Sequence, residues 1–339
     1  MQQPVTLASF LGNAPVVHIM RGALARNRLP HALIFAGPSG VGKRTLAWLV
    51  AQRINCLSPA GEDACGACRS CLKIISDLIR ADNGQAGNHP DIREIRPEGT
   101  VIRIEQIRAL INEVAFEPFE ARYRFAILDG ADQMKTETAN SLLKTLEEPP
   151  SRTYLILITS NPYSLLPTIR SRCRLLQFGG LPQQEIEEYL IGVQKFDSNE
   201  ARLAAFFSNG SLGAALSFDS QHYPKVRKQA LLFVQLLLSP SSRFTEASRL
   251  SALQYKDKDG FQPWMESVMA LLQDVYFAQV APERMGQSDI GDELTQLAAS
   301  VPRSRIVSAI EAMKTLKKEL VRNLNRQIAL ESLYLSRQG

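Results

Sequence analysis

A glycine-rich loop between an apolar strand and a helix is the feature that most constrains how this chain can fold. Residues 37–44 read Gly-Pro-Ser-Gly-Val-Gly-Lys-Arg. The apolar run at residues 31–36 predicts a short buried strand, and residues 45–51 predict a helix. In this order of strand, loop and helix, the glycines turn backbone N–H groups inward to cradle phosphates. The pattern therefore predicts a doubly wound α/β core of the nucleotide-binding type.

The loop departs from that chemistry at its last position. The residues expected to hold phosphates are Gly37, Gly40, Gly42 and Lys43. Arg44 occupies the place where a Ser or Thr hydroxyl would bind Mg²⁺, and a guanidinium has no lone pair for a metal. Thr45 lies about 100° further round the helix, so its ability to replace that hydroxyl stays open. The loop indicates a nucleotide-binding ancestry and leaves ATP binding itself in question.

Further apolar runs extend the predicted sheet. Residues 124–129 and 154–159 read as fully buried parallel strands. Residues 136–148 between them predict one helix, which ends at Pro149 and Pro150. The first part of the chain is therefore expected to alternate strands and helices.

From about residue 183 onward the strand signals disappear. Helical periodicity marks residues 183–192, 198–208, 226–238, 263–278 and a closing segment at 304–336. A chain of 339 residues is also too long for one ordinary core. We expect an α/β domain at 1–178, a small helical domain at 179–220 and an all-helical domain at 221–339.

Composition places the chain among soluble globular proteins. Hydrophobic residues make up 45% and charged residues 22%. No apolar stretch approaches the roughly 20 residues of a membrane helix, and the first residues lack a basic segment followed by an apolar run. These features predict a cytoplasmic protein without a membrane partner. The net charge of +5 does not by itself indicate a nucleic-acid partner.

Four of the five cysteines lie within sixteen residues. They are Cys56, Cys65, Cys68 and Cys71, spaced C-x8-C-x2-C-x2-C. This spacing favours a tetrahedral Zn²⁺ site, and disulfides are disfavoured in a reducing cytoplasm. Four cysteine ligands leave no open position for catalysis, so the predicted site at residues 56–71 is structural. Cys173 lies more than a hundred residues away and is not expected to be a ligand.

Several segments together resemble the clamp-loader ATPases of the AAA+ superfamily and, within them, the delta-prime family of bacterial DNA polymerase III. They are the glycine loop, the four-cysteine insertion, Asp-Gly-Ala-Asp at 129–132, Ser-Leu-Leu-Lys-Thr-Leu-Glu-Glu-Pro-Pro at 141–150, Ile-Arg-Ser-Arg-Cys at 169–173, and residues 323–331. The resemblance spans the chain and is densest before residue 178. It implies an AAA+ core at 1–178, a helical lid at 179–220 and a helical collar at 221–339.

The resemblance also implies that the subunits of such a complex differ in ATP hydrolysis. In that family some subunits hydrolyse ATP, whereas the delta-prime type does not. Three positions here depart from the hydrolysing pattern: Arg44 in the loop, Gly130 after Asp129 where active members carry Glu, and Gly213 where they carry a sensing arginine. Asp129 then remains as the residue of a degenerate acidic motif. The chain is expected not to hydrolyse ATP by itself.

Arg172 is present where the family resemblance implies a working group. In such rings the arginine of Ser-Arg-Cys enters the ATP site of a neighbouring subunit and stabilises the transition state there. The implied partners are gamma or tau subunits and a delta subunit in a pentameric ring, and through the ring a sliding clamp and primed DNA. The complex belongs to the DNA-directed DNA polymerase III holoenzyme. The alternative for Arg172 is a surface ion pair or a helix cap.

Two other functions stay open at this stage. One is an ATP-hydrolysing subunit of the gamma or tau type, which would bind and turn over ATP with Mg²⁺. The other is a free-standing zinc-dependent DNA-binding protein, which would bind primed DNA without companions.

Overall fold

The computed structural model of the chain describes residues 6–82, 85, 89–239, 245, 248–249, 261–320 and 325–335. The chain forms two compact units: Met1–Ile186 with Asn209–Gly213, and Glu187–Ser208 with Ala214–Gly339. The range 179–220 thus contributes residues to both units. The division into core, lid and collar stays a prediction.

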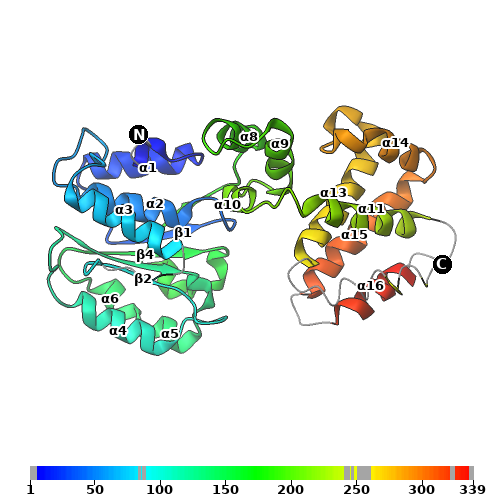
Figure 1. Cartoon of the computed structure of the whole chain (residues 1–339). Coiled ribbons are helices and arrows are strands. Elements are labelled where there is room, and N and C mark those ends of the chain that lie inside the picture. The colour runs from blue at the N-terminus through cyan, green and yellow to red at the C-terminus, as the bar shows by residue number, and fades with distance from the viewer. Residues whose placement is uncertain are drawn as a thin grey trace. The chain divides into compact units, whose positions relative to one another are not determined.

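A five-stranded parallel sheet forms the centre of the first unit (Figure 1). Its strands are β1 (Ala32–Ala36), β2 (Ile92–Ile95), β3 (Arg124–Asp129), β4 (Thr153–Thr159) and β5 (Arg174–Gln177), in the order β2-β3-β4-β1-β5. The helices of this unit are α1 (Ala14–Ala25), α2 (Lys43–Asn55), α3 (Arg69–Asp82), α4 (Ile104–Val114), α5 (Thr136–Ser141), α6 (Leu143–Glu147) and α7 (Pro167–Arg170). The α/β fold class expected from the sequence is confirmed.

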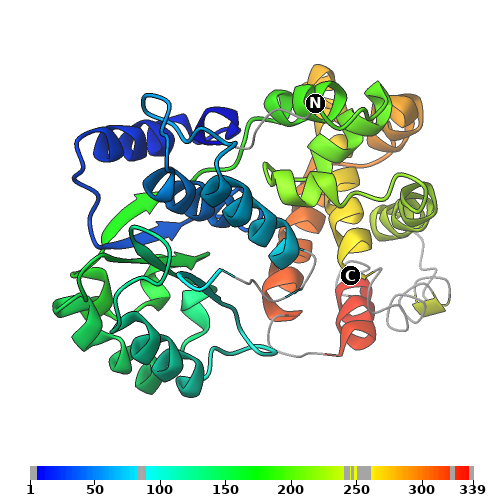
Figure 2. The ribbon, with the colours of Figure 1, turned by 60° about the vertical axis from the view of Figure 1, so that its left-hand side comes forward.

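Helices lie on both faces of the sheet, which explains why its central strands are apolar along most of their length. Ile34, Ala126 and Leu157 belong to the core cluster that also contains apolar residues of α4, α5 and α6. Figure 1 shows α1, α2 and α3 on the other side of the sheet. Figure 2 shows α2 and α3 side by side.

Three of the five strands were predicted correctly from the sequence, whereas β2 and β5 were missed. Both missed strands have four residues and carry polar side chains, as in Ile-Arg-Glu-Ile of β2. They lie at the two ends of the strand order, where each pairs with one neighbour only. Short edge strands of mixed polarity lack the apolar run that marks a buried central strand.

The single helix predicted at residues 136–148 is wrong, because the structure breaks it at Leu142 into α5 and α6. The Ser141 hydroxyl donates to the Thr138 carbonyl at 2.7 Å, and the Leu142 N–H donates to Ala139 only three residues back. Both bonds tighten the backbone and interrupt the regular helical ladder.

The second unit is helical among its described residues. Its helices are α9 (Ser198–Phe207), α11 (Tyr223–Leu238), α13 (Phe261–Val280), α14 (Gly291–Ala299), α15 (Arg303–Leu320) and α16 (Arg326–Leu335), while α8 (Gln183–Gly192) and α10 (Leu212–Leu216) contribute to both units. The side chains of Phe233 and Trp264 pack together in its core, with ring centroids 5.1 Å apart. Among the described helices, none is long and apolar enough to cross a membrane.

The closing segment predicted at residues 304–336 contains two helices, α15 and α16, in its described part. Asn325 lies between them, and its side-chain oxygen accepts from the Gln327 N–H at 3.0 Å and the Ile328 N–H at 3.3 Å. This is the geometry of a helix N-cap, so α16 starts afresh. Residues 321–324 and 336 of the predicted segment, including the start of the family-like stretch at 323–331, lie outside the described residues.

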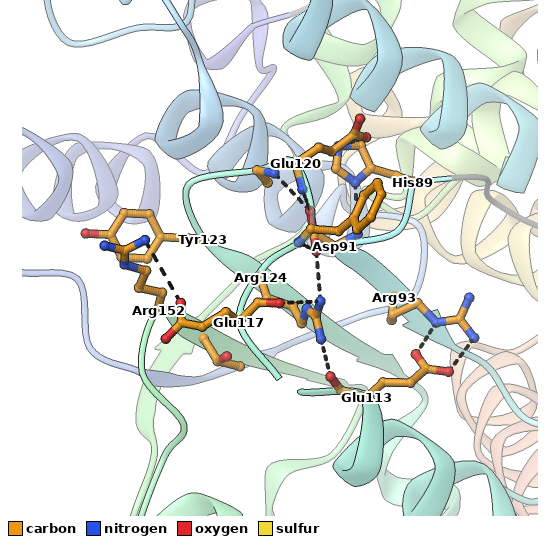
Figure 3. Close-up of polar contacts among 12 residues, drawn as sticks. His89, Asp91, Arg93, Glu113, Glu117, Glu120, Tyr123, Arg124 and Arg152 are labelled. Carbon is orange, nitrogen blue, oxygen red and sulfur yellow. Dashed lines mark hydrogen bonds and ion pairs between the residues drawn. The ribbon is translucent and has the colours of Figure 1, made fainter. Parts of the chain in front are cut away.

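A buried carboxylate fixes the loop that precedes β3 (Figure 3). Asp91 is fully buried and accepts the backbone N–H groups of Phe119, Glu120 and Ala121 at 2.7–2.9 Å. The Arg124 guanidinium donates to the same carboxylate at 2.9 Å. Burial acts to raise the pKa of Asp91, but the three N–H groups and Arg124 outweigh it and lower this pKa. The folded unit therefore holds Asp91 ionised.

We expect Asp91→Ala to lower the free energy of unfolding of the first unit by about 3–5 kcal/mol, because it leaves the buried Arg124 without its counter-charge. The contribution of Asp91 is present above its ordinary pKa of 3.8 and is lost as the pH falls through the lowered folded value. Urea denaturation at pH 7 measures the effect. The control is Glu98→Gln, which removes an exposed ion pair with Arg103 and should cost less than about 1 kcal/mol. Equal losses in the two variants would contradict the assignment.

Candidate functional site

The glycine loop follows β1 directly and leads into α2. Gly37 has φ +150°, and a Cβ there would lie 2.4 Å from the carbonyl oxygen of Phe178, just after β5. Glycine is therefore required where the loop passes closest to the neighbouring chain segment. Gly40 and Gly42 also have positive φ values, +72° and +92°. The sequence-predicted strand, loop and helix are all present.

Lys43 is the first residue of α2, and its ammonium group is folded back onto the loop. Its Nζ donates to the carbonyl oxygens of Gly37 at 2.6 Å and Pro38 at 2.5 Å. Burial lowers the pKa of Lys43, while the charges of Asp129 and Asp132 act in the opposite direction. The lysine and these two carboxylates thus share one electrostatic environment.

Arg44 is held by two carboxylates from other elements. Its Nε and one terminal nitrogen donate to the two oxygens of Glu94 on β2, the second bond measuring 2.9 Å. Its other terminal nitrogen donates to Asp82 at the end of α3. Burial acts against the charged guanidinium, but the hydrogen bond and charge of Glu94 outweigh it and raise the pKa of Arg44. The side chain that replaces the metal-binding hydroxyl is therefore a fixed part of the fold.

A second arginine completes this cluster. Arg96 donates from Nε to Glu94 at 3.0 Å and from a terminal nitrogen to the Ala81 carbonyl at 3.0 Å. Glu94, Asp82 and Arg96 were not predicted from the sequence. Nothing in their spacing connects them to Arg44, because the contacts join α2, α3 and β2.

Asp129, the residue that remains of the degenerate acidic motif, lies at the end of β3. Burial raises the pKa of Asp129, and so does the charge of Glu94, while Arg44 and Arg96 act to lower it. Gly130 follows with φ +84°, a left-handed conformation that side chains other than glycine rarely adopt. A glutamate could not take this position without backbone strain. Asp132 accepts from the Ser160 hydroxyl at 2.9 Å, which agrees with a hydrogen-bonded structural role.

Gly213, the third position that departs from the hydrolysing pattern, packs directly on the glycine loop. The Gly213 N–H donates to the Gly40 carbonyl at 2.9 Å. A Cβ at Gly213 would lie 3.2 Å from the Gly40 Cα, and a Cβ at Gly40 would lie 2.1 Å from the Ser211 hydroxyl oxygen. The segment 209–213 therefore lies against the loop with little room for a larger side chain at either glycine.

Arg172 lies after α7 and is partly exposed, with 34% of its side chain accessible. Its guanidinium donates to the Thr168 carbonyl at 2.9 Å and pairs with Glu147 of α6 at 2.5 Å. Arg170 instead lies over the Tyr163 ring, with its guanidinium carbon 5.2 Å from the ring centroid. The two arginines of the Ile-Arg-Ser-Arg-Cys segment at 169–173 thus have different partners.

The four clustered cysteines come together as their spacing predicts. Their Sγ atoms all lie within 4.8 Å of one another. A Zn–S distance of about 2.3 Å gives sulfur separations of about 3.8 Å in a tetrahedron. Cys56 and Cys65 are 3.5 Å apart and Cys65 and Cys71 are 3.9 Å apart, so the set fits a four-thiolate metal site.

The local backbone also suits thiolates. The N–H groups of Cys65, Cys68 and Cys71 point to the sulfurs of the preceding cysteines at 3.3–3.5 Å. Burial acts to raise the pKa of Cys68, but the N–H groups of Cys71 and Leu57 outweigh it and lower this pKa to about 6. Cys173 packs against a different core cluster, and burial raises its pKa to about 12. Its separation from the cluster agrees with the expectation from the sequence.

Asp129→Asn is expected to stabilise the first unit at pH 7, because folding raises the pKa of this carboxyl and so opposes its ionisation. The gain should shrink as the pH falls through the raised folded pKa and vanish below the ordinary value of 3.8, where Asp129 is neutral in both the folded and the unfolded chain. Urea midpoints of the variant and the parent at pH 7 and pH 4 measure the difference. A variant less stable than the parent at pH 7 would contradict the assigned environment.

Comparisons with known proteins give a first group of relatives named for the delta and delta' subunits. The family described as "DNA polymerase III, delta subunit" matches residues 12–182. "DNA polymerase III subunit delta'" of Bacillus subtilis is 31% identical, with 95% of each chain covered. "DNA polymerase III subunit delta'" of Pseudomonas aeruginosa is 29% identical over 89% of this chain and 90% of the relative.

A second group of relatives carries another name. "DNA polymerase III subunit tau" of Escherichia coli is 28% identical over 98% of this chain, which spans 54% of that relative. Among solved structures, the Thermotoga maritima RuvB Holliday junction branch migration motor covers 90% of this chain at 14% identity, with a TM-score of 0.44.

Proposed function

This chain belongs to the DNA polymerase III delta-subunit family, and from that premise we propose that it works as a non-hydrolysing delta' subunit of a clamp loader. It acts as a stator beside hydrolysing gamma or tau subunits and a delta subunit in a pentameric ring. The ring places a sliding clamp on primed DNA during DNA replication by the polymerase III holoenzyme. Full-length similarity to two delta' relatives supports the choice of subunit.

The pairing of Arg44 with Glu94 and Asp82 carries the non-hydrolysing part of the proposal. A guanidinium that is fixed in place of the Mg²⁺-binding hydroxyl offers the metal no lone pair. The conformation of Gly130 and the packing of Gly213 on Gly40 support the same conclusion, since each disfavours the side chain that hydrolysis would need.

Arg172 supplies the catalytic contribution in this proposal. It enters the ATP site of the neighbouring subunit and stabilises negative charge on the phosphoryl group in transit. Its partial exposure supports this role, because the guanidinium can exchange its present partners for a phosphate. Arg170 is less suited, since it is less exposed than Arg172.

An ATP-hydrolysing subunit of the gamma or tau type is the second candidate. The tau relative of Escherichia coli favours it, because it matches nearly the whole of this chain. The three departures at Arg44, Gly130 and Gly213 oppose it. The family relationship argues against a free-standing zinc-dependent DNA-binding protein.

Replacing Arg172 with Ala in a reconstituted loader should reduce ATP hydrolysis at the adjoining site by about 10³-fold or more. Single-turnover hydrolysis in the presence of clamp and primed DNA isolates that site, because only its share of the product is delayed. Arg170→Ala is the matched control and should leave the adjoining site active.

Two outcomes would overturn the proposal. Normal hydrolysis at every site of the Arg172→Ala loader would remove the role in trans. Mg²⁺-dependent ATP turnover by the isolated parent chain would favour the gamma or tau type.

The four-cysteine cluster holds a structural Zn²⁺ in this proposal. Cys56, Cys65, Cys68 and Cys71 would provide all four ligands, so the metal would brace the insertion without taking part in chemistry. The cluster is tied to the start of the chain by Asp63, whose carboxylate accepts from the Leu7 and Ala8 N–H groups at 3.1 and 2.6 Å.

Purified protein should contain about one equivalent of zinc, measured by elemental mass spectrometry. Cys68→Ser should lower the content below about half an equivalent and lower the thermal midpoint, because ligand loss removes binding free energy from the folded state. Cys173→Ser is the control and should keep its zinc. Similar zinc contents in the two variants would contradict the four-thiolate site.

The remaining parts of the proposal follow from the family. Residues 179–220 serve as the lid and residues 221–339 as the collar that joins the ring. The collar is proposed on the helical core of the second unit, in which α11, α13 and α15 pack together. The cytoplasm is the proposed location, where chromosomal replication takes place.

A further inference from the structure

The guanidinium of Arg172 is held by three neighbours. One terminal nitrogen donates to the Thr168 carbonyl at 2.9 Å and to the Ser171 hydroxyl at 3.3 Å. The other pairs with Glu147 Oε1 at 2.5 Å. Two of these partners belong to the same short chain segment as Arg172. Glu147 does not, because it comes from α6.

The fold holds both ends of this ion pair in place. Glu147 is the last residue of α6 and follows Leu146, which is buried and whose carbonyl lies 3.1 Å from His31 Nε2. On the other side, the Arg172 N–H donates to the Ile169 carbonyl at 3.1 Å, and Ile169 is fully buried. The pair therefore joins two anchored elements that are 25 residues apart in sequence.

The ion pair with Glu147 affects how Arg172 can act on the nucleotide of a neighbouring subunit. An arginine stabilises a transferring phosphoryl group through its positive charge. A carboxylate already paired with it offsets that charge and occupies the donor that a phosphate oxygen would accept. Engagement with a neighbour's nucleotide therefore exchanges Glu147 for phosphate.

The exposure of the pair makes this exchange feasible. The Arg172 and Glu147 side chains are 34% and 49% exposed. A pair of this kind shifts an equilibrium by about five-fold at most, because water screens it and solvates the freed groups. The ion pair is strong enough to favour one orientation of the Arg172 guanidinium and weak enough to be replaced by a contact with phosphate.

We propose that Glu147 is a positioning residue that holds Arg172 in a parked orientation until the neighbouring subunit presents its nucleotide. This inference rests on the role of Arg172 in trans proposed above. The parked and engaged orientations compete, so Glu147 lowers the fraction of engaged Arg172 in the resting ring. Its carboxylate thereby restrains hydrolysis before DNA and clamp bring the subunits together.

Glu147→Gln in the reconstituted ring tests this inference, because it keeps the size of the side chain and removes its charge. Without DNA, kcat/KM for ATP at the adjoining site should rise by about two- to five-fold. Glu148→Gln is the matched control: Glu148 is the next residue, it is exposed, and no ion pair involves it among the described residues. This control should leave kcat/KM unchanged.

Glu147→Gln in a ring that also carries Arg172→Ala distinguishes an effect of Glu147 on Arg172 from an effect of Glu147 on the fold. There Glu147→Gln should leave kcat/KM unchanged, because no guanidinium remains to be released. An equal change in both backgrounds would overturn the inference, and so would an unchanged or lowered kcat/KM with Arg172 present. Thermal midpoints of the isolated variants check that the fold is kept.

The failure of this inference differs from the failure of the proposed function. If Arg172→Ala slows the adjoining site and Glu147→Gln does not accelerate it, the role in trans stands and the parking role of Glu147 is wrong. If Arg172→Ala leaves the adjoining site unchanged, the role in trans is wrong and the inference falls with it.

Discussion

Parallel pairing of the five strands makes every strand end at the same edge of the sheet, and the region around the glycine loop depends on this constraint. The loop leaves β1 there, Asp129 ends β3 there, and Gly37 meets Phe178 after β5. Residues from distant parts of the chain then share one electrostatic environment. Burial raises the pKa of Asp129, and the nearby charge of Glu94 adds to that rise. The pairing of Arg44 with Glu94 results from the same convergence.

The sequence predicted the parts of this site that a local pattern encodes. The glycine spacing predicted a loop between a strand and a helix, and the structure has it, with positive φ values at Gly37 and Gly40. Buried central strands are apolar along most of their length, so β1, β3 and β4 were visible as runs. The spacing of the cysteines likewise contained the turn that brings their sulfurs together.

The sequence could not predict contacts that only the tertiary structure creates. Glu94 reaches Arg44 because β2 ends beside α2, and Glu147 reaches Arg172 because α6 ends beside α7. In each pair the residues are ordinary surface-type charges, with no periodicity to connect them. The break at Leu142 was missed for a similar reason, since a serine hydroxyl within an apolar helical pattern gives no sign of which carbonyl it will bind.

The left-handed backbone at Gly130 has a consequence for the history of such a chain. A glutamate introduced there would carry the strain of a positive φ before its carboxylate could act on water. Its Cβ would also lie only 3.1 Å from the Cγ atom of Pro97, so the proline ring would have to shift. A Gly130→Glu substitution thus carries this strain before any gain in chemistry can offset it. The glycine makes the present chemistry hard to reverse.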